Sequence, residues 1–202
     1  VFVNQPTEFP PPPGPNESYQ ATSATDFEGD GLHEFLVARM LLVGWQFQFV
    51  DMRLLRETAP GVVVDMGPAA APGVEIQSRG LFDDVDGDGD QDYLNQDGAW
   101  LNNGSGYFTS AGSSFAGYLP VAMGDVDGDG DNDFVASKVN GGSSVAVIYR
   151  TGPATFIVDV LFPPISTVIG MTSAVLADLD DDGDLDVAGG DNPVGNQYRT
   201  NI

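Results

Sequence analysis

The chain contains no cysteine, a single histidine and few basic residues. Its 202 residues include seven Lys and Arg against 30 Asp and Glu, which gives a net charge of −23. Without cysteine, neither disulfides nor thiolate metal sites are available. With so few cations the chain cannot neutralise a phosphate backbone, so nucleic acid is excluded as a partner and anionic membrane surfaces are disfavoured.

Long apolar segments are missing as well. The longest uncharged run, Met40 to Val50, is too short to span a bilayer and is interrupted by Gln46 and Gln48. No charged segment followed by an apolar one opens the chain, which begins at Val1 and not at a methionine. We therefore expect no membrane span and a processed product whose targeting segment has been removed.

Turn-forming residues, by contrast, are abundant. The chain has 26 glycines and 14 prolines, which favour many turns over long helices. Residues 1–20 are predicted to form an arm, in which the β-prone segment Val1–Val3 precedes a semi-rigid polyproline run at Pro10–Pro13. A plain solvated tail is an equal alternative. Residues 21–202 are predicted to form one repeat domain, and glycosylation sequons occur at Asn16 and Asn103.

Acidic residues are concentrated in four short segments. These are loop one (Asp26–Glu34), loop two (Asp84–Asp92), loop three (Asp125–Asp133) and loop four (Asp178–Asp186). They hold four, five, five and six acids, which together make 20 of the 30 in the chain. A solvated acidic face would scatter its charge, whereas a cation site concentrates it. The segments therefore predict four cation-binding loops.

Each loop places oxygen-bearing residues on alternate positions. Acids occupy positions one, three, five and nine, glycine at position six allows a sharp turn, and position seven offers a backbone carbonyl. Position twelve holds Val37, Asn95, Ala136 and Gly189 instead of the closing glutamate of an EF-hand, so we assign the last ligand to position nine. The predicted ligands are Asp26, Glu28, Asp30, Leu32, Glu34, Asp84, Asp86, Asp88, Asp90, Asp92, Asp125, Asp127, Asp129, Asp131, Asp133, Asp178, Asp180, Asp182, Asp184 and Asp186.

Calcium is the predicted ion, with three to four ions per chain. Magnesium keeps its waters and requires tight octahedral geometry, so a cage made only of protein oxygens favours calcium. A phosphate loop is the other interpretation of Gly87-Asp-Gly89, but the interleaved aspartates would repel phosphate. Ions that bind only the folded state stabilise it by mass action, and we expect this role in preference to calcium sensing.

Short β-prone runs enter and leave each loop, which predicts an all-β fold. The entering runs are Ala21–Thr25, Val74–Ile76, Leu119–Met123 and Ser173–Ala177, and the leaving runs are Glu34–Met40, Tyr93–Asn95, Phe134–Val139 and Leu185–Ala188. Turn signals at Asp97-Gly98 and Asn140-Gly-Gly142 predict hairpins to third strands, and fourth runs follow in three units. The loops begin 58, 41 and 53 residues apart. We predict a β-propeller-like array of about four four-stranded antiparallel units, with one large sandwich as the alternative.

The last unit shows no fourth strand, whereas Val1–Val3 is a strand without a unit. A sheet that misses a strand has an open edge, which proteins normally cover. We hypothesise that Val1–Val3 completes the last unit. Within one chain this pairing would close a ring, and between chains it would link subunits head to tail into a fibre.

The Asp-x-Asp-Gly-Asp-Gly-x-x-Asp segments, flanked by apolar strands, resemble the FG-GAP/VCBS repeats of integrin-α-type β-propellers. The resemblance covers Thr25–Phe35, Phe82–Leu94, Gly124–Val135 and Ala177–Val187 closely. It implies calcium between the first two strands of each blade, and secretion or display at the cell surface. The Phe-Gly and Gly-Ala-Pro signatures are absent, so the VCBS variant is nearer. Four repeats are visible where integrin-type propellers have seven, which leaves a four-unit ring, an open array and a fragment as alternatives.

The sequence predicts a protein that is not an enzyme, because its one histidine, His33, lies inside loop one and most carboxylates are assigned to metal. The favoured function is an extracellular structural or adhesion protein stabilised by calcium, which self-assembles into a fibre through its N-terminal strand. A calcium-dependent carbohydrate-binding protein is the alternative. The aromatic residues that could stack on a sugar are Trp45, Trp100, Tyr107 and Tyr118, for which core packing is the commoner role.

Overall fold

A computed structural model describes residues 10–27, 29–68, 80–112, 114–139, 145–162, 173–190 and 197–201. All elements in these ranges are β-strands, which confirms the predicted all-β fold. The strands are β1 (Glu17–Thr25), β2 (Glu34–Val43), β3 (Gln46–Ala59), β4 (Val62–Pro68), β5 (Leu81–Asp83), β6 (Asp92–Asn95), β7 (Gly98–Asn102), β8 (Phe108–Gly112), β9 (Tyr118–Gly124), β10 (Asp133–Lys138), β11 (Val145–Gly152), β12 (Thr155–Phe162), β13 (Ser173–Ala177), β14 (Asp186–Gly190) and β15 (Gln197–Asn201).

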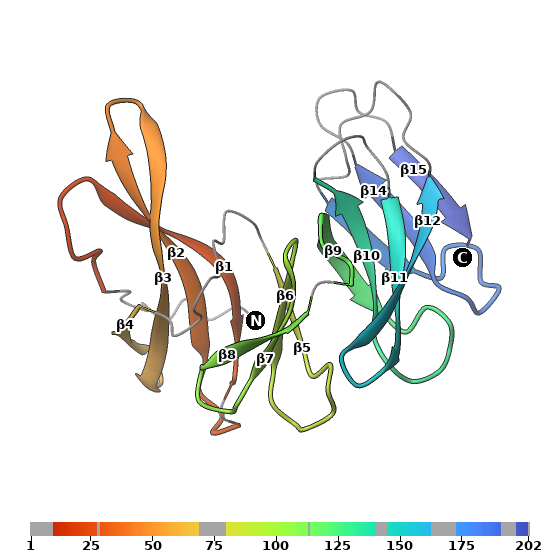
Figure 1. Ribbon diagram of the computed structural model, residues 1–202, viewed down its shortest axis with the longest axis horizontal. Coiled ribbons are helices and arrows are strands. Elements are labelled where there is room, and N and C mark those ends of the chain that lie inside the picture. The colour runs from red at the N-terminus through yellow and green to blue at the C-terminus, as the bar shows by residue number, and fades with distance from the viewer. Residues whose placement is uncertain are drawn as a thin grey trace.

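The strands form four antiparallel sheets in chain order. Sheet A contains β1 to β4, sheet B β5 to β8, sheet C β9 to β12 and sheet D β13 to β15, and within each sheet consecutive strands are neighbours. The first strand of sheet B contacts the first strands of sheets A and C, and β9 of sheet C contacts β13 of sheet D. The sheets therefore stack side by side as a propeller-like array (Figure 1).

The hydrophobic core lies between neighbouring sheets, and strand β10 shows how the sequence creates it. Phe134 and Ala136 pack toward sheet B, whereas Val135 between them packs toward sheet D. Successive side chains of a strand point to opposite faces, so a strand between two sheets must be apolar on both. All three residues are fully buried, and burying each large side chain contributes about 1.5–3 kcal/mol.

An aromatic cluster joins sheets A and B. Phe27 of loop one contacts Phe82 of β5 and Phe108 of β8 edge-on, with ring centroids 4.9 and 5.5 Å apart. Tyr93 and Trp100 of sheet B are buried in the same cluster. Edge-to-face aromatic pairs add about 0.5–1.5 kcal/mol to the burial of their surface. The second residue of loop one is therefore part of the core that fixes the loop.

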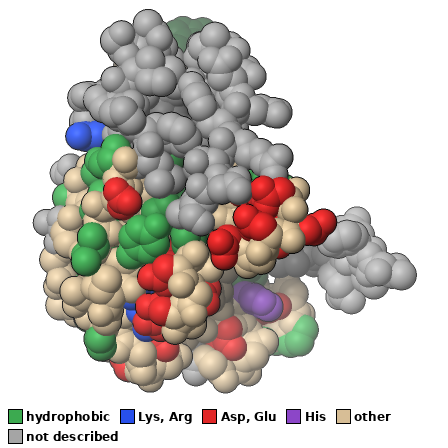
Figure 2. Space-filling view, turned by 90° about the vertical axis from the view of Figure 1, so that its right-hand side faces the viewer, with side chains coloured by type: hydrophobic (Ala, Val, Ile, Leu, Met, Phe, Trp, Pro, Cys, Tyr) green, Lys and Arg blue, Asp and Glu red, His purple; other side chains and the backbone are tan. Residues whose placement is uncertain are grey.

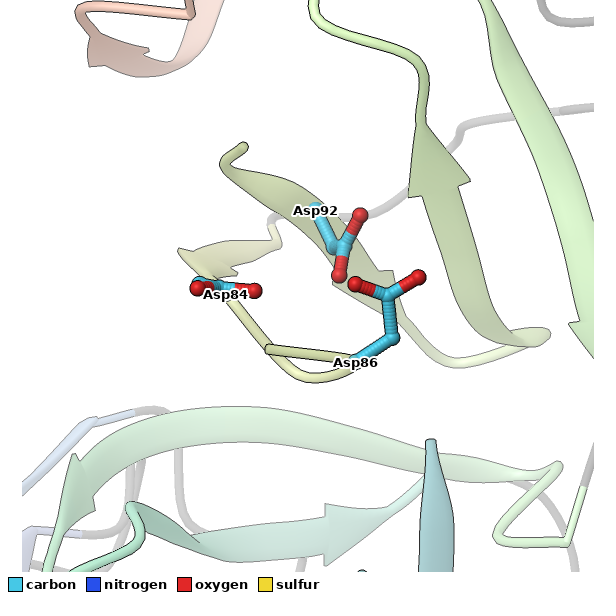
Figure 3. Close-up of side chains that lie close together, drawn as sticks. All are labelled: Asp84, Asp86 and Asp92. Atoms are coloured by element: carbon cyan, nitrogen blue, oxygen red, sulfur yellow. The ribbon is translucent and has the colours of Figure 1, made fainter. Parts of the chain in front are cut away.

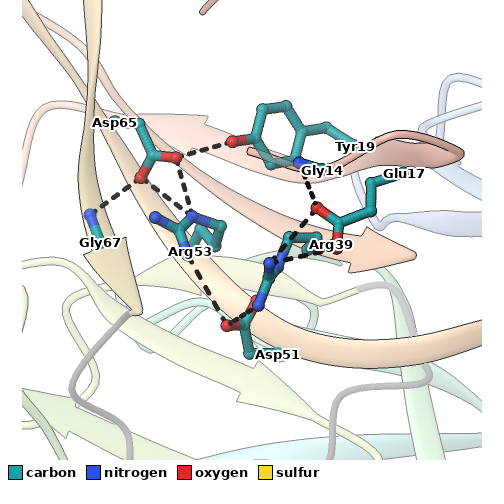
Figure 4. A network of polar contacts seen from close by, with 8 residues as sticks. All are labelled: Gly14, Glu17, Tyr19, Arg39, Asp51, Arg53, Asp65 and Gly67. Atoms are coloured by element: carbon teal, nitrogen blue, oxygen red, sulfur yellow. Dashed lines mark hydrogen bonds and ion pairs between the residues drawn. The ribbon is translucent and has the colours of Figure 1, made fainter. Parts of the chain in front are cut away.

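The face of sheet A that points away from sheet B carries a charged network beside a small buried apolar cluster. Arg39 donates to both carboxylate oxygens of Asp51 at 2.8 and 2.7 Å and contacts Glu17, while Arg53 and Tyr19 share Asp65 (Figure 4). Burial and the hydrogen bond to Asp65 raise the pKa of Tyr19 to about 12. The cations of this sheet are thus paired with their own neighbours.

Most predicted strands are present, with two adjustments. The strand that enters loop two is Leu81–Asp83, whereas the predicted run Val74–Ile76 lies outside the described residues. Strand β1 begins at Glu17, inside the segment predicted as an arm. The Asp97-Gly98 signal located the hairpin correctly, because Asn95 pairs with Gly98 across a two-residue turn. The Asn140 turn and Val1–Val3 also fall outside the described residues.

Sheet D contains three strands in the described part of the chain, as expected for the last unit. Its outer face exposes Val175 and its loop exposes Leu179, which are 61% and 46% accessible. The corresponding second residues of loops one to three, Phe27, Val85 and Val126, are buried between sheets. Two apolar side chains are therefore exposed at the sheet D end of the array, among the residues that the structure describes.

Candidate metal centres

Each acidic loop connects the first and second strands of a sheet. Loop one joins β1 to β2, loop two β5 to β6, loop three β9 to β10 and loop four β13 to β14. Acidic side chains gather in separate patches in the space-filling view (Figure 2). The four-fold repetition in the sequence is therefore a four-fold repetition of one structural position.

The aspartate at position one organises the turn. Asp84 accepts the N–H groups of Gly87 and Asp88 through Oδ1, at 2.8 and 3.1 Å, and that of Gly89 through Oδ2 at 3.0 Å. The same position accepts loop N–H groups in the other loops, through Asp26, Asp125 and Asp178. A short carboxylate side chain favours such local bonds to the backbone. The carboxylate at position one therefore fixes the conformation of the loop backbone.

Positive φ angles explain why glycine recurs at positions four and six. At position six, Gly31, Gly89, Gly130 and Gly183 have φ between 85° and 99°. At position four, three loops have glycine with φ between 67° and 82°, whereas loop four has Asp181 at 61°. Residues with a side chain rarely adopt this region, and aspartate is among those that tolerate it. The positive φ is the physical reason for the glycine at position four of the Asp-x-Asp-Gly-Asp-Gly pattern.

The acid at position nine lies at the base of the loop and is buried. Asp92, Asp133 and Asp186 are at most 1% exposed, and Glu34 is fully buried. Each accepts the N–H of position two, at 2.7 to 3.0 Å. Asp92 also accepts the N–H of Asn102 in the third strand of its sheet, at 2.7 Å. Position nine thus ties the loop to the sheet as well as facing the other acids.

Three of the loops bring the acids of positions one, three and nine together. The groups are Asp84, Asp86 and Asp92 in loop two, Asp125, Asp127 and Asp133 in loop three, and Asp178, Asp180 and Asp186 in loop four. Within each group one oxygen per residue lies within 4.8 Å of the others, as Figure 3 shows for loop two. Two oxygens on opposite sides of one calcium ion would lie about 5 Å apart, so the groups fit a single hard cation.

The electrostatics of the groups also fit a cation. Burial raises the pKa of Asp92 to about 6, the N–H groups of Asn102 and Val85 oppose this rise, and the neighbouring Asp86 and Asp88 add to it. Burial likewise raises the pKa of Asp133 and of Asp86. In loop three, Asp125 Oδ1 is shielded from solvent and has no hydrogen-bond partner in the described structure. A bound cation would satisfy that oxygen and offset the carboxylate charge.

The remaining predicted ligands do not belong to these groups in the described residues. Position-five acids instead accept the N–H of position seven, as Asp88 does from Asp90 at 2.9 Å. Position seven was predicted to contribute its carbonyl, and the side chains there are not part of the groups. Glu28 of loop one lies outside the described residues, so the site predicted from loop one stays a prediction.

Loop one differs in its surroundings. Its position-nine residue is the longer Glu34, whose Oε1 lies 3.4 Å from the Nε of Arg56. His33 of the same loop is 60% exposed, and its Nδ1 lies 3.3 Å from Oε2 of Glu57. The histidine is therefore a solvent-facing loop residue next to one carboxylate.

The four candidate sugar-stacking aromatics divide into two exposed and two packed side chains. Trp45 is 99% exposed and Tyr107 is 59% exposed. Trp100 is buried and donates its Nε1–H to Asn95 Oδ1 at 3.3 Å, and Tyr118 packs against the core beside Lys138. Core packing thus explains Trp100 and Tyr118.

Comparison with known protein families agrees with the loop geometry. The FG-GAP-like repeat family matches residues 125–189, from position one of loop three through the end of loop four. This part of the chain is therefore similar to an FG-GAP-like repeat. The matched segment contains strands β10 to β13 and most of β14. It therefore includes the acidic groups of loops three and four. The chain matches neither a curated protein nor a solved structure. No helix in the described ranges is long and apolar enough to cross a membrane.

Proposed function

We propose that the chain is a non-catalytic extracellular structural or adhesion protein whose β array is stabilised by three to four calcium ions. The observation that carries this proposal is the recurrence of one acidic group between the first two strands of successive sheets. Each group joins a loop to a buried position-nine carboxylate, so an ion bound there would fix the connection between two strands. Oxygen-only ligands in a nine-residue loop favour calcium over softer metals.

Calorimetry tests the stabilising role. The melting temperature of metal-free protein should rise markedly with millimolar calcium and much less with the same concentration of magnesium. The matched control is the triple variant Asp86→Asn, Asp127→Asn, Asp180→Asn, which keeps the shape of each loop but removes one charge from each group. An unchanged transition in the unmodified protein would refute calcium stabilisation.

Self-assembly is the second part of the proposal. It is supported by the three-stranded sheet D, by the exposed Val175 and Leu179 at that end, and by the β-prone segment Val1–Val3. A strand from another copy would add to the sheet edge through backbone hydrogen bonds and cover apolar surface. Electron microscopy and light scattering check this directly. Filaments or concentration-dependent mass support it, whereas a constant monomer mass at all concentrations argues against it.

Carbohydrate binding is the alternative, and one observation favours it. Trp45 follows Gly44 at the tip of the β2–β3 hairpin, where Gly44 has φ 64° and Val43 pairs with Gln46 across a two-residue turn. The indole is almost fully exposed, with Leu42 and Phe47 nearby on the same hairpin. Such a side chain offers a flat surface for a sugar ring. A glycan array in calcium buffer, with Trp45→Ala as the control, decides between the two functions.

A further inference from the structure

Arg150 of β11 contacts two acidic loops that belong to different sheets. Its Nη1 donates to the backbone carbonyl of Asp84, position one of loop two, at 2.8 Å. Its Nη2 lies 3.2 Å from Oδ1 of Asp131, position seven of loop three. The Arg150 side chain is only 12% exposed, whereas that of Asp131 is 39% exposed, so the bridge is shielded from solvent at its arginine end. A single guanidinium therefore holds the backbone of one loop and the side chain of the next.

Further contacts join the same two loops. The backbone N–H of Arg150 donates to Oδ1 of Asp133, the buried position-nine acid of loop three, at 2.9 Å. Asn132 of loop three donates to Asp83, which directly precedes loop two, at 2.9 Å. The N–H of Ala154, in the turn after β11, donates to the carbonyl of Val85 at 2.8 Å. Loops two and three are thus joined through both side chains and backbone.

Sheet B does not repeat this bridge toward sheet A. The residue whose N–H reaches the position-nine acid there is Asn102, and its side-chain oxygen accepts the N–H of Gly106 within the same sheet. Arg56 of sheet A pairs with Glu34 of its own loop. The arginine bridge is therefore a specific feature of the junction between sheets B and C in the described structure.

We propose that Arg150 couples calcium binding in loops two and three, an inference that rests on the calcium binding proposed above. An ion in loop two fixes Asp84 and its carbonyl, and Arg150 passes this restriction to Asp131 and Asp133 in loop three. The second ion then binds to a loop that is already ordered, so its binding costs less conformational entropy. The coupling is positive, and linkage requires that it act equally in both directions.

Two glycine amides provide a separate readout for each loop. Gly89 donates to Asp84 Oδ2 at 3.0 Å and Gly130 donates to Asp125 Oδ2 at 3.1 Å, so each reports on its own position-one carboxylate. Calcium titrations of the full chain followed by ¹H–¹⁵N NMR give an affinity for each loop. Asp86→Asn should weaken calcium binding at loop three about tenfold, and Asp127→Asn should weaken loop two by the same factor.

The decisive measurement repeats these titrations in Arg150→Gln. In that variant Asp86→Asn should leave the affinity of loop three within about twofold of its value in Arg150→Gln alone. Arg150→Lys keeps the charge without the planar fork and should behave in the same way. Asp180→Asn is the control. In the described residues Arg150 contacts loops two and three, so any effect of Asp180→Asn on loop three should persist in Arg150→Gln.

The outcomes separate the two proposals. Undiminished coupling in Arg150→Gln, or full coupling in Arg150→Lys, would overturn the bridging role. If neither glycine amide responds to calcium in the unmodified chain, the proposed calcium function itself fails. Should Arg150→Gln not fold, Arg150→Lys alone carries the comparison.

Discussion

Loops one and two have the same backbone design but different neighbours for their buried acid. In loop two, Asp92 accepts two backbone N–H groups, from Val85 and from Asn102. In loop one, Glu34 accepts the N–H of Phe27 with one oxygen and faces the guanidinium of Arg56 with the other. Loop one therefore has a cation from the protein itself, next to the position where loop two presents only acids and amides.

This difference shows that the sheets balance their acidic residues in different ways. Three of the seven Lys and Arg lie on β2 and β3, where they pair with acids of the same sheet. Loops two and three carry five acids each against four in loop one, and sheets B and C have fewer cations, so we expect a bound ion to take the place of those cations. We expect sheet A to keep its structure without calcium and the others to depend on it. Four predictions test this contrast.

Removing calcium should have the largest effect on stability, and the loss should differ between the sheets. Each site loaded at about 100 times its dissociation constant stabilises the fold by about 2.7 kcal/mol, so three ions contribute about 8 kcal/mol. Hydrogen exchange in metal-free buffer should speed up strongly in β6 and β10 but little in β2. Titrating magnesium to the same ionic strength controls for screening. Equal acceleration in all three strands would contradict the contrast.

Truncating the buried acid of loop two should have the second-largest effect on stability. Asp92→Ala leaves the N–H groups of Val85 and Asn102 without an acceptor inside the protein, and each loss costs about 1–3 kcal/mol. Urea unfolding should show a loss of about 4 kcal/mol even without calcium. The exposed Asp159 is the matched control, and Asp159→Ala should change stability by less than about 0.5 kcal/mol. A loss seen only with calcium would mean that Asp92 acts purely as a ligand.

Removing the cation next to loop one should lower the free energy of unfolding somewhat less. Arg56→Met leaves the fully buried Glu34 without its charged neighbour, and breaking a buried pair costs about 3 kcal/mol. The variant should then depend on calcium in β2 as the unmodified chain does in β6. Hydrogen exchange with and without calcium measures this. Arg53→Met is a control that removes a cation from the same strand but leaves Glu34 paired. If the amides of β2 in Arg56→Met are equally protected from hydrogen exchange with and without calcium, the contrast between loops one and two is wrong.

The loops and strands could be predicted because they depend on local sequence. Acids at alternate positions and glycine at position six repeat in every unit, and the flanking strands follow from apolar runs and turn residues. The entering strand of sheet B was misplaced because Leu81–Asp83 is short and continues directly into loop two, so its alternation is hidden among acids. The local sequence pattern therefore located the loops and most strands, but not a short strand whose residues continue into an acidic loop.

Contacts between units could not be predicted in this way. Nothing near Arg150 in the sequence indicates that its side chain meets Asp84, which lies 66 residues earlier. The pairing of Arg56 with Glu34 likewise follows from the register of β2 and β3. Position nine was assigned as a ligand, and its second role as acceptor for the third strand appears only when the sheet is assembled. Sequence pattern identifies ligands, whereas packing decides which loops share partners.

The smallest predicted effect is a reversal of the pH dependence. Burial raises the pKa of Asp92 to about 6, so without calcium the folded state holds a proton that the unfolded state, with a pKa near 3.9, has lost. This stability is present at low pH and disappears as pH rises through about 6. Lowering the pH from 7 to 5 in metal-free buffer should therefore stabilise the fold by about 1 kcal/mol.

With saturating calcium the sign should reverse, because protons compete with the ion for the same carboxylates. Urea unfolding at pH 5, 6 and 7, with and without calcium, measures both slopes. Asp92→Asn cannot titrate at this position and should reduce the metal-free slope. Stability that falls between pH 7 and pH 5 in metal-free buffer would contradict this prediction, because it would mean that Asp92 stays ionised without calcium and that the N–H groups of Val85 and Asn102 outweigh its burial.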